Sequence, residues 1–277
     1  MTTSLRADRV PFRFSGPDAQ KLLNDVLTSR IVAEGGAARW WALLSPQGKV
    51  QAEGLIGWAD GAFWLDVHRD VADAFFKRMR MYKLRANVTM EDLRETHVVG
   101  WTAAGPEGSV ADLDPRGIDL GWRIIASGEA ATGWRDDDIA WHWARISGGI
   151  AEMGAEFATD VVFPHDIGMD LLGGVDFTKG CYVGQEVVSR MQHRGTARRR
   201  PVIVSGLPAD AAPGMPILVG EREAGSIGPP VNGEAVAIVR LDRFDGSAEP
   251  TVGGLPVELN LRRWATYKFG EAAEEGV

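Results

Sequence analysis

Cysteine is nearly absent from this chain: Cys181 is the only thiol in 277 residues. A single thiol excludes an internal disulfide framework and is typical of a reducing compartment. It also excludes an iron–sulfur cluster held by the thiols of this chain alone, because such clusters usually need about four. The patterns GxGxxG after a strand and GxxxxGK[ST] are missing as well. The sequence therefore predicts no glycine-rich loop of the kind that binds nucleotide phosphates.

Long apolar runs and an excess of basic residues are also missing. No apolar run approaches the roughly 20 residues of a membrane helix, so we predict no membrane partner. The first residues, MTTSLRADRVPFRFSG, contain no apolar segment typical of a secretory signal, and we expect a cytoplasmic protein. The net charge of -8 and the pI near 5.2 argue against a general nucleic-acid binder. Only the run HRGTARRR, residues 193–200, leaves room for a local basic patch.

What is present is typical of a soluble globular protein, with 45% hydrophobic and 25% charged residues. The length suggests two or three domains. A strand is predicted over residues 10–14, and the next helix has its buried stripe at Leu22, Leu23, Val26 and Leu27. The turn SPQGK predicts a hairpin with Gly48 at the bend. A second helix after residue 69 is expected to bury one face, comprising Val71, Ala74, Phe75 and Met79.

The pattern changes near Arg200. From Pro201 onward, short strands are separated by Gly and Pro turns, which predicts a small antiparallel barrel or sandwich. The earlier part mixes hairpins with crossing helices, which favours α+β layers over a doubly wound parallel sheet.

The only thiol lies in the stretch KGCYVGQEVVSRMQHRG, residues 179–195. A helix is predicted to begin at Gly184-Gln185-Glu186 and to end at Gly195. The start of this helix and the ammonium group of Lys179 would both stabilise a thiolate at Cys181 and lower its pKa. The alternative interpretation is a small buried hydrophobic residue, since free cysteine is among the most buried residue types.

The basic run after this helix contains Arg194, Arg198, Arg199 and Arg200. These guanidinium groups could grip a polyanionic ligand tail, or they could be a solvated link between helix and barrel. No two of the five histidines stand at zinc-ligand spacing, and we predict no metal site.

The residues KGCYVGQE, 179–186, resemble the signature of folate-binding proteins related to the glycine-cleavage T-protein, the aminomethyltransferase superfamily. They match the branch linked to iron–sulfur cluster assembly and repair, whose bacterial members are also called tRNA-modifying or folate-binding proteins. Other stretches along most of the chain are similar to that family: SGPDAQKLLNDVLTSRI, LLSPQGKVQAEGLI, RISGGIAEMG and VRLDRF.

The resemblance implies a three-domain cloverleaf around a central tetrahydrofolate pocket, with a C-terminal antiparallel β-barrel. We expect a discontinuous folate-binding α+β domain (1–45 plus 130–197), a second α+β domain (46–129) and the barrel (198–277). Asp166, which follows Pro164, stands where the T-protein has a pterin-binding carboxylate, although it would also serve as a helix cap. The resemblance further assigns folate contacts to Tyr182, Gly184, Gln185, Glu186, Arg194 and Glu53.

One departure from the T-protein concerns its acidic pair near the folate reaction centre, which is Ala52-Glu53 in this chain. Losing an acid argues against glycine-cleavage activity. We therefore expect a folate-binding protein that assists iron–sulfur cluster assembly or repair through Cys181 and Lys179, in contact with assembly or client proteins. Two alternatives are a one-carbon transferase acting on a small amine or tRNA, with a carboxylate such as Glu53 at the reaction centre, and a scaffold whose pocket is a relic.

Overall fold

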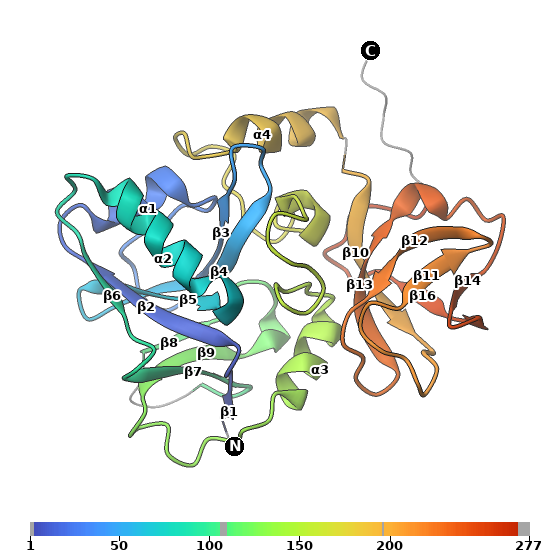
Figure 1. Cartoon of the computed structure of the whole chain (residues 1–277), viewed down its shortest axis with the longest axis horizontal. Coiled ribbons are helices and arrows are strands. Elements are labelled where there is room, and N and C mark those ends of the chain that lie inside the picture. Colours follow the sequence, from blue (N-terminus) through green and yellow to red (C-terminus); the bar gives the residue numbers. More distant parts are fainter. Residues whose placement is uncertain (1–2, 106–109, 196, 271–277) are drawn as a thin grey trace.

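The computed structural model describes residues 3–105, 110–195 and 197–270, and within these ranges the strands form three antiparallel sheets. Two sheets pack together in the N-terminal part, and the third forms a separate body at the C-terminal end (Figure 1). The segment between them carries the helices α3 and α4.

The first sheet is built by hairpins and has the strand order β3-β4-β5-β2-β6. Its strands are β2 (Arg9–Ser15), β3 (Arg39–Leu44), β4 (Val50–Ala59), β5 (Ala62–His68) and β6 (Thr89–Asp92). The turn between β3 and β4 closes where predicted, with Gly48 at φ 78° and its N–H bonded to the carbonyl of Ser45 at 2.9 Å. This hairpin carries two of the largest buried side chains, Trp40 and Trp41.

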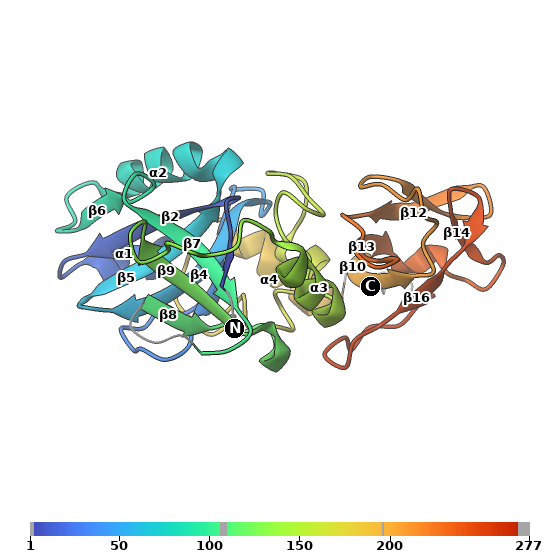
Figure 2. The same ribbon diagram turned by 90° about the horizontal axis from the view of Figure 1, so that it is seen from below.

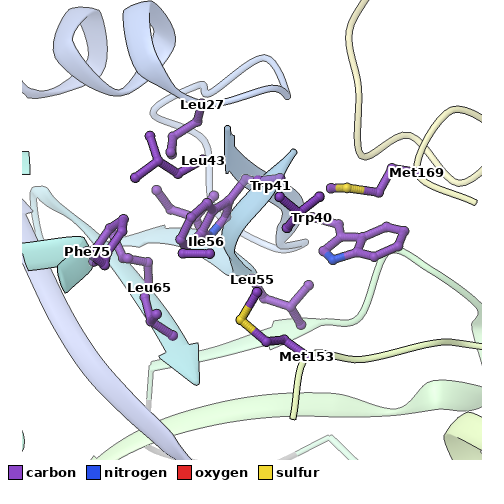
Figure 3. Close-up of a cluster of buried hydrophobic side chains, with 14 of the residues drawn as sticks. Leu27, Trp40, Trp41, Leu43, Leu55, Ile56, Leu65, Phe75, Met153 and Met169 are labelled. Carbon is purple, nitrogen blue, oxygen red and sulfur yellow. The ribbon is translucent and has the colours of Figure 1, made fainter. Parts of the chain in front are cut away.

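The main hydrophobic core lies between this sheet and the helices α1 (Ala19–Val26) and α2 (Arg69–Lys83). The predicted stripe of α1 is buried in full, but α2 buries Ala72 rather than Ala74, which is exposed. Its apolar face is therefore turned slightly from the predicted one. Met153 and Met169, from a much later segment, close the core beside Trp40 (Figure 3).

The second sheet packs on the opposite face of the first, through Trp64, Val99 and Ile125. Its order is β1-β7-β9-β8, with β1 (Ser4–Leu5), β7 (His97–Thr102), β8 (Val110–Leu113) and β9 (Trp122–Ser127). The predicted domain boundary between residues 45 and 46 does not agree with this architecture. It falls in the turn between β3 and β4, which are hydrogen-bonded neighbours in one sheet.

The third sheet has the order β15-β14-β11-β12-β13-β10-β16 and curls around its own core (Figure 2). Its strands are β10 (Arg199–Ser205), β11 (Pro216–Val219), β12 (Arg222–Ile227), β13 (Glu234–Arg240), β14 (Pro250–Val252), β15 (Leu255–Pro256) and β16 (Glu258–Asn260), with the short helix η3 (Leu241–Arg243).

The remaining helical elements lie between the strands or between the sheets. They are η1 (Ile118–Leu120), α3 (Ile139–Gly148), η2 (Pro164–Ile167) and α4 (Gln185–Arg194). The helix α4 begins beside the tip of the β3–β4 hairpin and ends next to the chain that enters β10 (Figure 1). Within the described residues, no helix is both long and apolar enough to cross a membrane.

Candidate functional site

The only thiol is exposed and lies on the loop that leads into α4. The predicted helix is confirmed: α4 starts at Gln185, and Gly195 ends it in the left-handed conformation. Cys181 therefore stands a few residues before the positive end of a helix dipole and faces solvent, as the reactive interpretation requires. The alternative of a buried filler is wrong.

A carboxylate that the sequence argument missed shapes this loop. One oxygen of Asp176 accepts hydrogen bonds from the backbone N–H groups of Thr178 and Lys179, at 2.7 and 3.0 Å. Its other oxygen accepts a bond from Nε of Arg30 at 2.8 Å. Partial burial acts to raise the pKa of Asp176, but the hydrogen bonds from Thr178 and Arg30 outweigh it and lower this pKa to about 2. The spacing Asp-x-Thr before the motif was the available sequence signal.

Lys179 ties the same loop to the end of α1. Its ammonium group donates to the backbone carbonyl of Leu27 and, at 3.0 Å, to that of Ser29. It also lies 5.1 Å from the ring centre of Tyr182, which is buried in the core. Burial lowers the pKa of Lys179 to about 8. Both of these hydrogen bonds go to backbone carbonyls, so the expected action of Lys179 on the sulfur stays a prediction.

The start of α4 is fixed by close contact with the β3–β4 hairpin. Gly184 has φ 79°, and a Cβ atom there would lie 2.6 Å from the carbonyl oxygen of Ser45. A Cβ atom on Gly48 would lie 2.9 Å from Cβ of Val187. The backbones can approach this closely only because both positions are glycine. The motif glycine therefore docks α4, and with it the cysteine loop, on the hairpin tip.

The other predicted folate contacts lie on η2 and along α4, two elements that touch each other. Asp166 is buried at the start of η2, where its Oδ2 accepts from the N–H of Phe163 at 3.0 Å, the capping contact considered above. Burial raises the pKa of this carboxyl. Gln185 is half-buried, while Glu186 and Arg194 are exposed along α4. None of these residues lines the central cavity described next, and their folate contacts stay predictions.

An enclosed, charged cavity lies between the first two sheets. Its lining includes Arg6, Arg9, Asp66, Arg116, Arg123 and Glu152, together with the rings of Trp101 and Trp141. Arg6 meets Glu152 at 2.8 Å, Arg9 meets Asp66 at 2.7 Å, and Arg123 meets the other oxygen of Asp66 at 2.9 Å. Burial acts to raise the pKa of Glu152, but the charges of Arg6 and Arg9 hold it well below its usual range.

Glu53 belongs to this network. It is fully buried, with one oxygen accepting from Nη1 of Arg9 at 3.0 Å and the other from Nε1 of Trp40 at 2.8 Å. Both oxygens are therefore occupied by donors. The sequence argument placed Glu53 near the reaction centre but did not identify Arg6, Arg9 and Glu152, whose pairings join distant segments.

The cavity is lined by residue types that could bind a pterin, because carboxylates can accept from its N–H groups and indole rings can stack on it. The space does not suit it in this conformation. The cavity volume is about 20 Å³, which accommodates a water molecule but not a pterin ring. A folate could enter only after some arginine–carboxylate contacts had opened.

The fold as a whole is that of an aminomethyltransferase. The chain superposes on the glycine cleavage system aminomethyltransferase T from Bartonella henselae with a TM-score of 0.70 at 14% identity, covering 97% of this chain and 88% of that one. The family model "CAF17, C-terminal beta-barrel domain" matches residues 198–267. These findings confirm the predicted α+β fold class with its C-terminal barrel.

Sequence relatives identify the family. The chain is 32% identical to the mitochondrial iron–sulfur cluster assembly factor IBA57 of Mus musculus, over 78% of this chain and 71% of that protein. It is 30% identical to the human protein of that name, over 69% and 63%. The chain thus belongs to the family of IBA57-type iron–sulfur cluster assembly factors, as the resemblance of its cysteine motif predicted.

Two qualifications come with these relatives. The chain spans about half the length of several fungal relatives, for example 55% of the IBA57 homolog of Pyricularia oryzae, to which it is 32% identical. The predicted cytoplasmic location is contradicted, because the mouse, human and fungal relatives are named as mitochondrial proteins. The absence of a signal-like N-terminus was too weak a basis for assigning a compartment.

Proposed function

We propose that this chain assists iron–sulfur cluster assembly by offering the Cys181 thiolate as one ligand to a cluster whose other ligands come from a partner protein. The observation that carries this proposal is the exposure of the only thiol on a loop clamped by Asp176 and Lys179. A thiolate is a soft ligand suited to iron, and one cysteine cannot satisfy a cluster that usually has about four. Among the described residues, no group of three or more His, Cys, Asp or Glu side chains could hold a metal ion.

The test is replacement of Cys181 by serine in cells that depend on this protein. Because Cys181 is exposed, Cys181→Ser should fold with a stability within about 0.5 kcal/mol of the unaltered protein. It should lose the ability to restore the activity of iron–sulfur enzymes under oxidative stress. Met81→Ala is the matched control, because Met81 is another exposed sulfur side chain, 65% exposed on α2. Full rescue by Cys181→Ser would end the proposal.

For tetrahydrofolate, we propose the central cavity as the binding site, with the contacts of Arg6 and Glu152 opening to admit the pterin. The likeness to the aminomethyltransferase fold and the paired carboxylate and indole groups support this location. When bound, reduced folate would supply one-carbon chemistry. Calorimetry with tetrahydrofolate tests the proposal, and a titration without heat of binding at several temperatures would favour a relic pocket.

The alternative of a one-carbon transferase receives less support. Such an enzyme needs a free carboxylate at its reaction centre, but both oxygens of Glu53 already accept hydrogen bonds from Arg9 and Trp40. Glu53→Gln would abolish turnover in a transferase and leave cluster assembly unchanged in the proposed function, provided that the variant folds.

A further inference from the structure

The basic run after the cysteine helix forms a surface that the proposed function does not yet use. Arg190 and Arg194 are exposed on α4 and lie one turn apart on the same face. Arg198 and Arg199 are exposed where the chain enters β10. We call these four residues the arginine surface. Figure 1 shows that α4 connects the cysteine loop to this strand.

The charges of this surface are unbalanced. Among the described residues, none of the four arginines makes a salt bridge, whereas the neighbouring Arg200 is paired with Asp170 at 2.7 Å. The one carboxylate on α4 is Glu186, in its first turn. Arg199 is the exception, because its charge acts on the buried carboxylate of Asp166 as well as on the ammonium group of Lys49.

Such a concentration of positive charge is unusual in a chain with a net charge of -8. Like charges held together repel one another, and their cost is relieved when an anionic partner binds. The position of the surface matters as well. It lies on the second half of the helix that follows Cys181 and on the strand after it, so a protein partner that also covered the start of α4 would reach the thiol.

We propose that the arginine surface docks an acidic protein partner and thereby brings that partner's cluster ligands to Cys181. This inference rests on the proposed function and names the chemistry of the partner. Exposed guanidinium groups pair readily with carboxylates, and complementary charge accelerates encounter more than it strengthens the final complex. A chain that supplies a single cluster ligand needs a partner to supply the others, and a docking surface on the adjoining helix would hold that partner near the thiol.

The test uses thiol–disulfide exchange at Cys181 with three synthetic peptides, each ending in a cysteine activated as a 2-pyridyl disulfide. The peptides carry six aspartates, six lysines or six serines. The Cys181 thiolate attacks the peptide sulfur and forms a disulfide with it, while the bond between the peptide sulfur and the pyridyl sulfur breaks. The released thiopyridone takes the electron pair of that bond and is measured by its absorbance. At low salt the aspartate peptide should react roughly tenfold faster than the lysine peptide, and the two rates should converge at about 1 M salt.

Paired variants distinguish the effect of the arginine surface from the effect of the protein's overall charge. Arg190→Glu with Arg194→Glu should abolish or reverse the preference for the aspartate peptide. Arg80→Glu with Arg85→Glu makes the same change of charge at exposed positions on and after α2 and should leave it intact. Equal rates for the three peptides in the unaltered protein would overturn the docking proposal alone. Failure of the serine peptide to react would instead overturn the proposed function, because Cys181 would not be accessible.

Two further measurements test other occupants of the arginine surface. A transfer-RNA hairpin that blocks exchange with the aspartate peptide at much lower concentration than free hexa-aspartate would assign the surface to nucleic acid and reject a protein partner. A dimer in size-exclusion chromatography that the Arg190→Glu, Arg194→Glu variant dissolves would assign it to a second copy of this chain. A monomer with a salt-sensitive aspartate preference would support the proposal.

Discussion

At the scale of single residues, the position of the Cys181 loop depends on neighbours to which the proposed function gives no chemical role. Asp176 orders the loop by accepting from Thr178, Lys179 and Arg30, while Thr28 ties the loop down through its Oγ1, which donates to the carbonyl of Gly174 at 2.6 Å. The sequence motif drew attention to Cys181 and Lys179. The residues that place them precede the motif and were not distinguished from ordinary loop residues.

Asp176→Ala should loosen the cysteine loop without unfolding the protein. Hydrogen bonds to a charged acceptor contribute about 1.5–3 kcal/mol each, so amide exchange at Thr178 and Lys179 should become much faster. Asp245→Ala is a matched control, because Asp245 makes a similar turn with Ser247 and pairs with Arg222 in the barrel. Unchanged exchange in residues 175–184 of Asp176→Ala would contradict the assigned role.

The pH dependence of this loop follows from the same carboxylate. The pKa of Asp176 in the folded protein, about 2, lies below the usual value of 3.8 for an aspartate. The stabilisation it gives is therefore complete above about pH 4 and is lost as the pH falls through 2. Exchange protection of the loop should follow that profile in the unaltered protein.

At the scale of secondary-structure elements, the sequence correctly predicted the features that depend on interactions between neighbouring residues. The helix α4, its glycine stop and the β3–β4 hairpin were all predicted, because their signals lie within a few residues of each other. The burial of Ala72 rather than Ala74 was missed, since it depends on how α2 is rotated against the sheet. The contact between Gly184 and the hairpin could not be predicted either, because it joins segments about 140 residues apart in the sequence.

Gly184→Ala should show how strongly that contact positions α4. Alanine at positive φ costs about 1 kcal/mol, and the added Cβ would also lie 2.6 Å from the carbonyl oxygen of Ser45. We expect a loss of about 2–4 kcal/mol in unfolding free energy, measured by urea denaturation. Gly173→Ala isolates the backbone term, since Gly173 has φ 73° with no atom near its Cβ position. Equal losses in the two variants would show that the close approach is unimportant.

At the scale of the whole molecule, the two N-terminal sheets are joined by buried charges rather than by apolar packing alone. Arg6, near the N-terminus, binds Glu152, and Arg123 of β9 binds Asp66 of β5. These partners are 146 and 57 residues apart. Sequence patterns gave no sign of them, because a buried arginine and an exposed one look alike along the chain. The family resemblance supplied the fold, but it did not supply the closed state of its central cavity.

Glu152→Ala tests whether this network holds the sheets together. The substitution removes the acceptor shared by Arg6 and Nε1 of Trp141, while Arg6 keeps its pair with Asp8 at 2.8 Å, so we expect a loss of about 1–3 kcal/mol. Urea denaturation should show that loss, whereas Glu186→Ala, at an exposed position on α4, should stay within about 0.5 kcal/mol of the unaltered protein. The same Glu152 variant should bind tetrahydrofolate much more weakly in calorimetry, because a carboxylate that lines the proposed site is gone. Retained folate binding by a folded Glu152→Ala protein would move the ligand out of the central cavity, while the cysteine loop and its arginine surface would keep their assignments.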